Sequence, residues 1–312
     1  MRRAIAALLL AAPLLCAAVE PRRIAITVDD LPWVEFALTP PDVVDERFDR
    51  LVATLAPAHA IGFVNEDKLE RDGRRDRRRV TMLERWLDAG IELGNHTYGH
   101  VGMHATPIAD YLAAIDRGDE VTGALLRERG RNEAWFRHPF LQAGRDDADR
   151  ATLAAWLEAH GYRVAPVTVD NGDWIFARAY VHALNANDAV LARRLRDDYV
   201  AYMDDKVAYY EQQSKRLFGR EIAQVLLCHA SALNADALPA LFARLRKRGY
   251  EFVTLESAVA DPAYAHADGY RGGAGISWMH RWAMAEGKPR TFYEGEPEVP
   301  RWIMDLAGVD SE

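Results

Sequence analysis

Short apolar runs and longer amphipathic stretches alternate along this chain. Short apolar runs bounded by polar or turn-forming residues are typical of buried strands. They lie at residues 24–28, 61–64, 91–93, 134–136, 162–169, 221–227 and 251–253. Apolar residues at helical spacing occupy most of the intervals between them, as in 42–60 and 80–89. This alternation predicts an α/β fold in which helices cover a parallel sheet.

Two stretches break the alternation. Asn187 and Asp188 have the character of a helix cap, and apolar residues then follow at helical spacing until Gly219. One continuous helix here would be roughly 45 Å long, far more than a crossover between parallel strands requires. Residues 261–312 are rich in aromatic residues and glycine and show no further clear strand. We therefore expect a long helical insertion and an aromatic-rich C-terminal extension.

The amino terminus has the layout of a secretory signal. Arg2 and Arg3 are basic, residues 4–18 are almost wholly apolar, and Ala17 and Ala18 close the stretch with small side chains. We expect residues 1–18 to be a signal peptide cleaved just after Ala18, and the protein to be exported, periplasmic or secreted. The stretch is shorter than the about 20 apolar residues of a membrane span.

Composition narrows the classes of function. With 49% apolar and 28% charged residues in 312, the chain is expected to be a soluble globular protein. The formal net charge of −8 becomes −10 once Arg2 and Arg3 leave with the signal peptide. An acidic exported protein is a poor candidate for binding nucleic acid or an anionic membrane. Cys228 is the only cysteine after residue 18, which excludes a disulfide within the mature chain. The arginine-rich residues 71–79 are expected to form a solvated loop that runs into a helix.

Polar residues able to do catalytic chemistry follow five of the predicted strands. They are Thr27-Val28-Asp29-Asp30, His96-Thr97-Tyr98-Gly99-His100, Arg137-His138-Pro139-Phe140, Asp170-Asn171-Gly172-Asp173-Trp174 and Leu227-Cys228-His229. A βα-barrel builds its active site from polar groups at the carboxyl ends of parallel strands. We therefore expect the five segments to meet in one site.

Asp30, His96 and His100 are candidate ligands of one metal ion. The two histidines are four residues apart, so one helical turn could aim both imidazoles at the same ion. With the carboxylate of Asp30 they would supply the three protein ligands of a hydrolytic zinc site. A histidine pair of this spacing is by itself more often two unrelated surface residues, so the prediction depends on the neighbouring segments. Zinc is the default ion for these ligands, and cobalt or another divalent ion also fits.

Four further residues are candidates for acid–base chemistry. Adjacent residues of an extended strand point in opposite directions, so Asp29 could face the reacting centre as a base while Asp30 binds the metal. Arg137 would offset the repulsion between the two carboxylates and orient Asp29 through paired hydrogen bonds. His229, kept charged by Asp173, could protonate a leaving group. Taken singly, each of these residues is more often part of a surface ion pair or a packed core.

Together, the five segments resemble the five ordered motifs of the polysaccharide deacetylases, the NodB-homology domain of carbohydrate esterase family 4. The first motif, Thr-Phe-Asp-Asp, is similar to residues 27–30, with Val28 in place of phenylalanine. The other four are His-(Ser/Thr)-x-x-His, Arg-x-Pro-(Tyr/Phe), Asp-x-x-Asp-Trp and Leu-x-His, similar to residues 96–100, 137–140, 170–174 and 227–229. The resemblance covers roughly residues 22–260.

The resemblance implies a fold and a set of roles. The fold would be a distorted (β/α)7 barrel, here placed at residues 19–262, with residues 263–312 packed on it. Asp29 would be the general base, Arg137 its positioning partner, and His229 a general acid tuned by Asp173. Asp30, His96 and His100 would hold the metal. The backbone N–H near Phe140, a residue also expected to contact substrate, would help to stabilise the oxyanion.

The chain departs from the family next to the aspartate pair. Members usually carry glycine there, whereas here Leu31 precedes Pro32 and Trp33. We expect Leu31 and Trp33 to narrow or reshape that edge of the site, with Trp33 in contact with substrate. Trp174 would form another wall, although a tryptophan after a strand is more often part of the core.

Three functions are compatible with these residues. The leading hypothesis is metal-dependent removal of an N-acetyl, or alternatively an O-acetyl, group from a carbohydrate in the cell envelope or outside the cell, with a glycan containing N-acetylglucosamine as the first candidate. The second is hydrolysis of a non-carbohydrate amide or imide bond by the same site behind an altered mouth. The third is a catalytically silent carbohydrate-binding protein, which we disfavour because Asp29 and His229 are both present. The sequence leaves the sugar and the oligomeric state open.

The aromatic residues of the extension allow two roles. Trp278, Trp282, Tyr293 and Trp302 could stack on sugar rings at the barrel mouth, or they could seal one side of the barrel. Sealing is the commoner role, because aromatic side chains usually bury most of their surface.

Overall fold

A computed structural model describes residues 21–132 and 134–312 of the chain. The predicted signal peptide, residues 1–18, lies outside the described residues, and export stays a prediction. In the part that is described, no helix is both long and apolar enough to cross a membrane.

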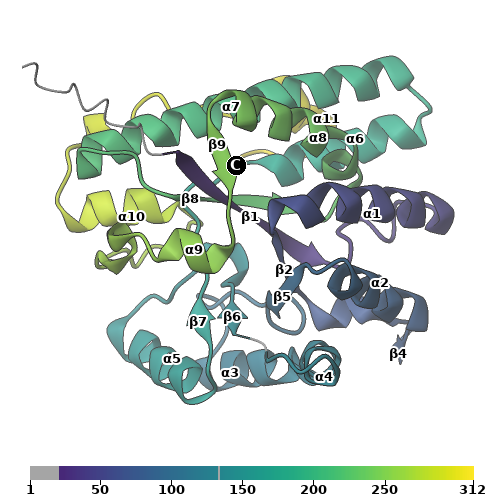
Figure 1. The fold of residues 1–312 in the computed structure, drawn as a ribbon, viewed down its shortest axis with the longest axis horizontal. Helices are drawn as coiled ribbons and strands as arrows, with labels where there is room; N and C mark the ends of the chain where they lie inside the picture. The colour runs from purple at the N-terminus through teal and green to yellow at the C-terminus, as the bar shows by residue number, and fades with distance from the viewer. Residues whose placement is uncertain (1–20, 133) are drawn as a thin grey trace, which may run out of the picture.

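The core of the protein is a curled sheet of seven parallel strands (Figure 1). The order of its strands is β7-β6-β5-β2-β1-β8, and β9 pairs with the first residues of β1. The strands are β1 (Arg22–Leu31), β2 (Ile61–Val64), β5 (Glu92–Asn95), β6 (Trp135–Phe136), β7 (Arg163–Val164), β8 (Gln224–His229) and β9 (Tyr250–Phe252). The strand predicted at 162–169 is shorter than expected, but an isolated parallel bridge joins Val169 to Leu226 and continues the curl.

The central strand β1 is buried on both faces, which explains its continuous apolar run. Its residues Ile24, Ile26 and Val28 belong to the main hydrophobic core. Ala25, which points the opposite way, packs in a second core together with Val225 of β8. Because both faces are covered, only the carboxyl end of the strand is free to present polar groups.

Helices cover the sheet on both sides (Figure 1). They are α1 (Pro41–Leu55), α2 (Arg77–Asp88), α3 (Ile108–Arg117), α4 (Glu120–Glu128), α5 (Asp147–Ala159), α6 (Asp173–Asn185), α8 (Ala232–Lys247) and α9 (Leu255–Val259). Short 3₁₀ helices lie at Ala56–Ala58, Glu66–Leu69, Pro139–Leu141, Pro262–Ala265 and Arg290–Phe292. The arginine-rich segment forms a small hairpin, β3 (Glu70–Arg71) and β4 (Arg74–Arg75), and then runs into α2. The alternation of strands and helices confirms the predicted α/β class.

The predicted long helix is confirmed as α7 (Ala189–Phe218), one continuous helix of 30 residues. At its start, the Asp188 side chain accepts a hydrogen bond from the backbone N–H of Leu191 at 2.9 Å. The helix ends at Gly219, whose left-handed φ of 70° glycine adopts without steric cost. Buried aromatic residues such as Tyr199 and Tyr210 line its inner face. It packs on α6 and α8 across one side of the protein (Figure 1).

The C-terminal extension contains two helices, α10 (Trp278–Ala285) and α11 (Arg301–Ala307). Trp278 and Trp282 are 7% and 1% exposed, so they seal the side of the sheet and offer no ring to a ligand. The hydroxyl of Ser277 donates to the carbonyl of Thr168 at 2.7 Å, which ties the extension to the segment before the fourth motif. The domain boundary at residue 262 stays a prediction.

Candidate metal and acid–base site

The carboxyl end of β1 presents both adjacent aspartates to the same side. Nε2 of His96 lies 3.7 Å from Oδ2 of Asp29 and 3.7 Å from Oδ1 of Asp30. The register of β1 against β2 shifts by one residue between Val28 and Leu31, and Asp30 has a φ of 67°. A bulge of this kind re-aims a side chain. The prediction that the two aspartates point in opposite directions is therefore wrong, because the strand is irregular at this position and both carboxylates approach His96.

His96 and His100 lie in the loop after β5, and the predicted helical turn is wrong. Thr97 and His100 have φ values of 63° and 51°, which bend the loop sharply back. The side chain of Asn95 accepts the backbone N–H of Thr97 at 2.8 Å, and the side-chain N–H of Asn65 donates to the carbonyl of His96 at 2.6 Å. The two imidazole rings nevertheless converge, with centroids 4.9 Å apart.

Asp30, His96 and His100 form a cluster with the geometry of a metal site. Their nearest ligand atoms all lie within 4.8 Å of one another. Nε2 of His96 and Nε2 of His100 are 3.7 Å and 3.6 Å from Oδ1 of Asp30. Ligands held about 2.1 Å from a tetrahedral zinc ion lie about 3.4 Å apart. Oδ1 of Asp30 is buried and has no hydrogen-bond partner among the described residues. The residues present therefore fit a zinc ion.

The two histidines have the protonation that metal binding requires. Nδ1 of His96 lies 2.8 Å from the carbonyl oxygen of Arg137, and a carbonyl only accepts, so Nδ1 carries the proton. The lone pair of Nε2 is then left free to face Asp30. Burial, followed by the charge of His100, lowers the pKa of His96 well below its ordinary value. Burial likewise lowers the pKa of His100. Neutral imidazoles are the form that binds a metal.

Lys68 is a residue of this site that the sequence analysis missed. Its ammonium nitrogen lies 3.1 Å from Oδ2 of Asp30 and 3.4 Å from the carbonyl oxygen of the same residue. Burial by itself raises the pKa of Asp30, but Lys68 and the neighbouring histidines lower it below its ordinary value. A signal was present, because polar residues 65–68 follow the predicted strand 61–64 just as the other site segments follow theirs.

Asp29 and Arg137 are buried neighbours, but they do not make the paired hydrogen bonds that were predicted. Nε of Arg137 is 3.9 Å from Oδ1 of Asp29, and Nη2 donates instead to the hydroxyl of Thr27 at 2.8 Å. The guanidinium also lies over the ring of Phe63 at 4.8 Å. Burial raises the pKa of Asp29 to about 6, against the opposing charges of Arg137 and His229. Asp29 is thus a carboxylate poised to titrate near neutral pH, as a general base must.

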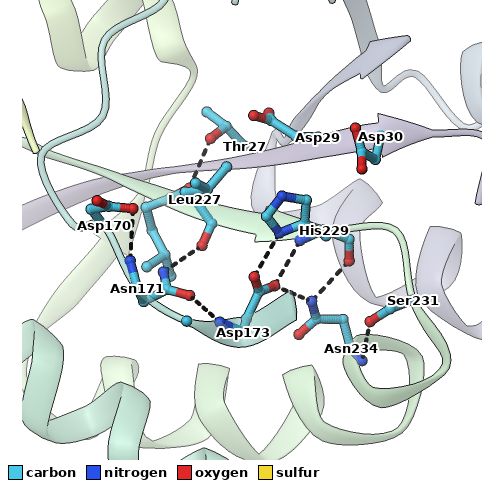
Figure 2. Close-up of polar contacts among 12 residues, drawn as sticks. Thr27, Asp29, Asp30, Asp170, Asn171, Asp173, Leu227, His229, Ser231 and Asn234 are labelled. Atoms are coloured by element: carbon cyan, nitrogen blue, oxygen red, sulfur yellow. Dashed lines mark hydrogen bonds and ion pairs between the residues drawn. The ribbon is translucent and has the colours of Figure 1, made fainter. Parts of the chain in front are cut away.

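His229 ends β8 and is held by Asp173, the first residue of α6 (Figure 2). Nδ1 of His229 lies 2.6 Å from Oδ1 of Asp173, and the backbone N–H of His229 donates to Oδ2 at 2.8 Å. Burial by itself lowers the pKa of His229, but the charge and hydrogen bond of Asp173, together with the charges of Asp30 and Asp29, raise it to about 9. The ring is therefore charged at neutral pH and can act as a proton donor.

Two asparagines position this pair, and the sequence analysis did not assign either of them. The side-chain N–H of Asn234, in the first turn of α8, donates to Oδ2 of Asp173 and to the carbonyl of His229, each at 2.8 Å. The side-chain oxygen of Asn171 accepts the backbone N–H of Asp173 at 3.1 Å. Asp170, the first residue of the fourth motif, does not join the pair and accepts the N–H of Asn171 at 2.9 Å (Figure 2).

Two of the three predicted substrate-contacting aromatic residues reach the surface. The side chain of Phe140 is 53% exposed, and its ring centroid is 4.4 Å from that of His100. Trp174, in the first turn of α6, is 39% exposed. Both are available to form walls of a substrate site.

Trp33 is fully buried, so its predicted contact with substrate is wrong. The backbone N–H of Val34 donates to the carbonyl of Ala230 at 2.9 Å, which turns the segment back over the end of β8. Leu31 is also fully buried and packs closely over Gly62, where an added Cβ would lie 2.0 Å from the leucine methyl group. Neither residue narrows the mouth of the site.

Comparison with solved structures shows the same fold in proteins of carbohydrate esterase family 4. A wild-type pseudoenzyme of that family from Bacillus anthracis aligns at 15% identity and a TM-score of 0.50, over 77% of this chain and 66% of its own. A mutant of that protein with restored enzymatic activity aligns at 16% identity and 0.50, over 77% and 68%. The peptidoglycan N-acetylglucosamine deacetylase Bc1960 aligns at 19% identity and 0.50, over 77% and 88%. These similarities confirm the predicted distorted (β/α)7 barrel.

Comparison of the sequence gives a family match over part of the chain. No curated protein matches the chain. Residues 17–165 match the sequence model of the polysaccharide deacetylases, a stretch that contains the first three motifs. The residues of the fourth and fifth motifs, 170–174 and 227–229, follow that stretch and complete the Asp173–His229 pair beside the metal cluster. The chain therefore carries polysaccharide deacetylase sequence over residues 17–165.

Proposed function

We propose that this protein is a metal-dependent hydrolase that removes the acetyl group from an N-acetylated carbohydrate. The observation that carries the proposal is the set of groups at one end of the sheet. A three-ligand cluster, Asp30, His96 and His100, adjoins Asp29, a carboxylate outside the ligand set, and His229, a histidine held in its charged form. The family match supports a carbohydrate as the substrate. An O-acetyl ester presents the same carbonyl to the same groups and is the second substrate class.

The roles of the residues follow from their positions. Asp30, His96 and His100 would hold the ion, which when bound would polarise the acetyl carbonyl and lower the pKa of the attacking water. Asp29 accepts the proton of that water as the new carbon–oxygen bond forms. His229 gives its Nε2 proton to the amine nitrogen as the carbon–nitrogen bond breaks, so acetate and a free amine leave. Throughout the reaction, Asp173 keeps Nδ1 of His229 protonated.

The structure gives less support to the two rival functions. An amidase for non-carbohydrate substrates was suggested by an altered mouth at Leu31 and Trp33, and both side chains are fully buried. The hypothesis of a catalytically silent binding protein has to be considered because one of the similar structures is a pseudoenzyme. Asp29 and His229 are both present and both beside the metal cluster, which favours an active enzyme.

The proposed location is outside the cytoplasm. Residues 1–18 have the layout of a secretory signal, and envelope or extracellular glycans are the acetylated carbohydrates that an exported enzyme would meet. A glycan that contains N-acetylglucosamine is the first substrate to test.

The test is acetate release by the purified mature protein from chitin oligomers, peptidoglycan and acetylated xylan, with and without a chelator. We expect release from at least one N-acetylated glycan, loss of release with chelator, and recovery on adding zinc. A cyclic imide and a small acylated amine serve as the comparison substrates. Turnover of these alone, or no turnover of any substrate by zinc-loaded protein, would contradict the proposal.

A further inference from the structure

The turn that carries Phe140 has a backbone conformation that needs support from its surroundings. Phe140 and Leu141 have φ values of 55° and 50°, two successive left-handed residues that both carry side chains. Non-glycine residues adopt this conformation only where neighbouring structure imposes it. The position of this turn sets where the Phe140 ring meets His100 and where the backbone N–H near Phe140 points.

The C-terminal extension contacts this turn at three successive residues. The side-chain N–H of Gln142 donates to the carbonyl of Gly273 at 2.8 Å. The backbone at Gly275 packs so closely that an added Cβ would lie 2.6 Å from the carbonyl oxygen of Phe140. Nη2 of Arg281 donates to the carbonyl oxygen of Leu141. The extension thus contacts the turn at Phe140, Leu141 and Gln142.

Arg281 is fixed in one orientation by its other contacts. It is fully buried, Nη1 donates to Oδ2 of Asp268 at 3.1 Å, and Nε donates to the carbonyl of Ile276 at 3.1 Å. Its guanidinium lies 4.1 Å from the ring centroid of Trp278. With all three nitrogens engaged and one face stacked, the planar group holds a fixed direction, which a lysine could not reproduce.

Asp268 links Arg281 to the rest of the barrel. It also accepts Nη2 of Arg150, on α5, at 3.1 Å. Arg150 and Arg281 share the single carboxylate of Asp268, so one positive charge is left without a partner in this group. Burying such a charge costs free energy unless its hydrogen bonds are well formed. An arginine that only fixed the extension to the barrel could donate its hydrogen bond to any nearby acceptor. Arg281 instead donates to the carbonyl of Leu141, a left-handed residue that directly follows the third motif.

We propose that Arg281 is a positioning residue for the proposed reaction. It holds Phe140 and Leu141 in their left-handed conformation, so that Phe140 and its backbone N–H stay placed against the metal ligand His100. The C-terminal extension is then a part of the active site's support and not only a cover for the sheet. This inference rests on the proposed function, and it assigns Arg281 no contact with substrate.

The test compares Arg281→Met with a matched control, Arg216→Met. Arg216 also donates to backbone carbonyls within the extension, those of Phe292 at 2.9 Å and Thr291 at 3.1 Å, but it does not touch the turn. For Arg281→Met we expect kcat/KM for the glycan to fall between about tenfold and a hundredfold. Zinc affinity should stay unchanged, and hydrogen exchange should speed up in residues 138–142. For Arg216→Met we expect activity and exchange in that segment to match the wild type.

Two further variants keep the comparison decisive if Arg281→Met fails to fold. Arg281→Lys should retain an intermediate activity, because lysine keeps the charge but cannot reach all three acceptors of the guanidinium. Gly275→Ala should mimic the loss without removing a charge, because its Cβ would push on the carbonyl of Phe140. Equal activities of the Arg281 and Arg216 variants, or unchanged exchange in residues 138–142, would overturn the role of Arg281. A wild-type protein inactive on every acetylated glycan would overturn the proposed function instead, so the two failures are distinguishable.

Discussion

Asp173 holds His229 at two points, since one carboxylate oxygen lies 2.6 Å from Nδ1 of the ring and the other accepts the backbone N–H at 2.8 Å. The ring and the main chain at the end of β8 are thereby fixed together. Burial lowers the pKa of His229, while the charge and hydrogen bond of Asp173 and the charges of Asp30 and Asp29 raise it, and the balance is a pKa of about 9. The same contact therefore sets both the direction of the proton donor and the pH range in which it carries a proton.

The first prediction concerns the pH dependence of kcat/KM. Activity should rise as Asp29 ionises, at or below its pKa of about 6, because a bound cation favours the carboxylate further. It should fall as His229 loses its proton, at or below its pKa of about 9, because the same cation disfavours the charged ring. Asp173→Asn removes the charge that raises the pKa of His229, so the basic limb should move to lower pH by more than one unit. The measurement is kcat/KM from pH 5 to 10.

The control for that profile is Asp170→Asn. Asp170 is a half-buried carboxylate of the same motif, with a pKa that desolvation raises to about 6, but it makes no contact with His229 that the structure records in the described residues. The basic limb should therefore stay in place. If the basic limb of the profile stays in place in Asp173→Asn, or shifts equally in both variants, then His229 is not the general acid.

The second prediction separates the two adjacent aspartates. Asp29→Asn should lower kcat by about 10²–10⁴-fold, the range expected for loss of a general base, and should leave one zinc bound per chain. Asp30→Asn should lose both activity and zinc, because Oδ1 of Asp30 lies within 3.7 Å of Nε2 of both imidazoles. Zinc content by elemental analysis, measured beside kcat, decides between the roles. If both variants keep zinc, the ligand assignment is wrong.

The elements of the fold were predictable because their signals are local. β1, β2 and α7 follow from apolar runs, helical spacing and the cap at Asp188, which depend on residues close in sequence. The strand predicted at 162–169 became two residues of β7 and a bridge at Val169. The length of this strand depends on its pairing with the distant strands β6 and β8, and the local sequence pattern carries no information on that pairing.

The sequence predicted which side chains gather at this end of the sheet, but it did not predict their geometry. The shared direction of Asp29 and Asp30 depends on a bulge between β1 and β2, and the convergence of His96 and His100 depends on left-handed residues in a loop. Side chains that reach the site from other segments, such as Lys68, carry no motif at all. These features depend on backbone irregularities and on contacts between distant segments, and neither leaves a periodic pattern in the sequence.

The third prediction concerns metal removal and stability. An ion that binds only the folded protein stabilises it, by about 2.7 kcal/mol at a free concentration one hundred times Kd. Zinc added to chelator-treated protein should therefore raise the Tm together with the activity. His96→Ala removes one of the three ligands and should abolish both responses. A Tm that rises equally in the wild type and in His96→Ala would indicate zinc binding elsewhere.

The fourth prediction concerns Trp33 and Trp174. Both were expected from the sequence to contact substrate, but only Trp174 is exposed in the structure. Trp33 is fully buried, so Trp33→Ala should lower the free energy of unfolding by about 3–5 kcal/mol. The fraction that remains folded should keep a KM close to that of the wild type. Trp174 keeps 39% of its surface exposed beside the Asp173–His229 pair, so Trp174→Ala should raise KM for the glycan while changing stability much less. Denaturant unfolding and steady-state kinetics on both variants check this pair. A raised KM for folded Trp33→Ala together with an unchanged KM for Trp174→Ala would mean that substrate approaches across the segment after β1, and the site would have to be redrawn around that side.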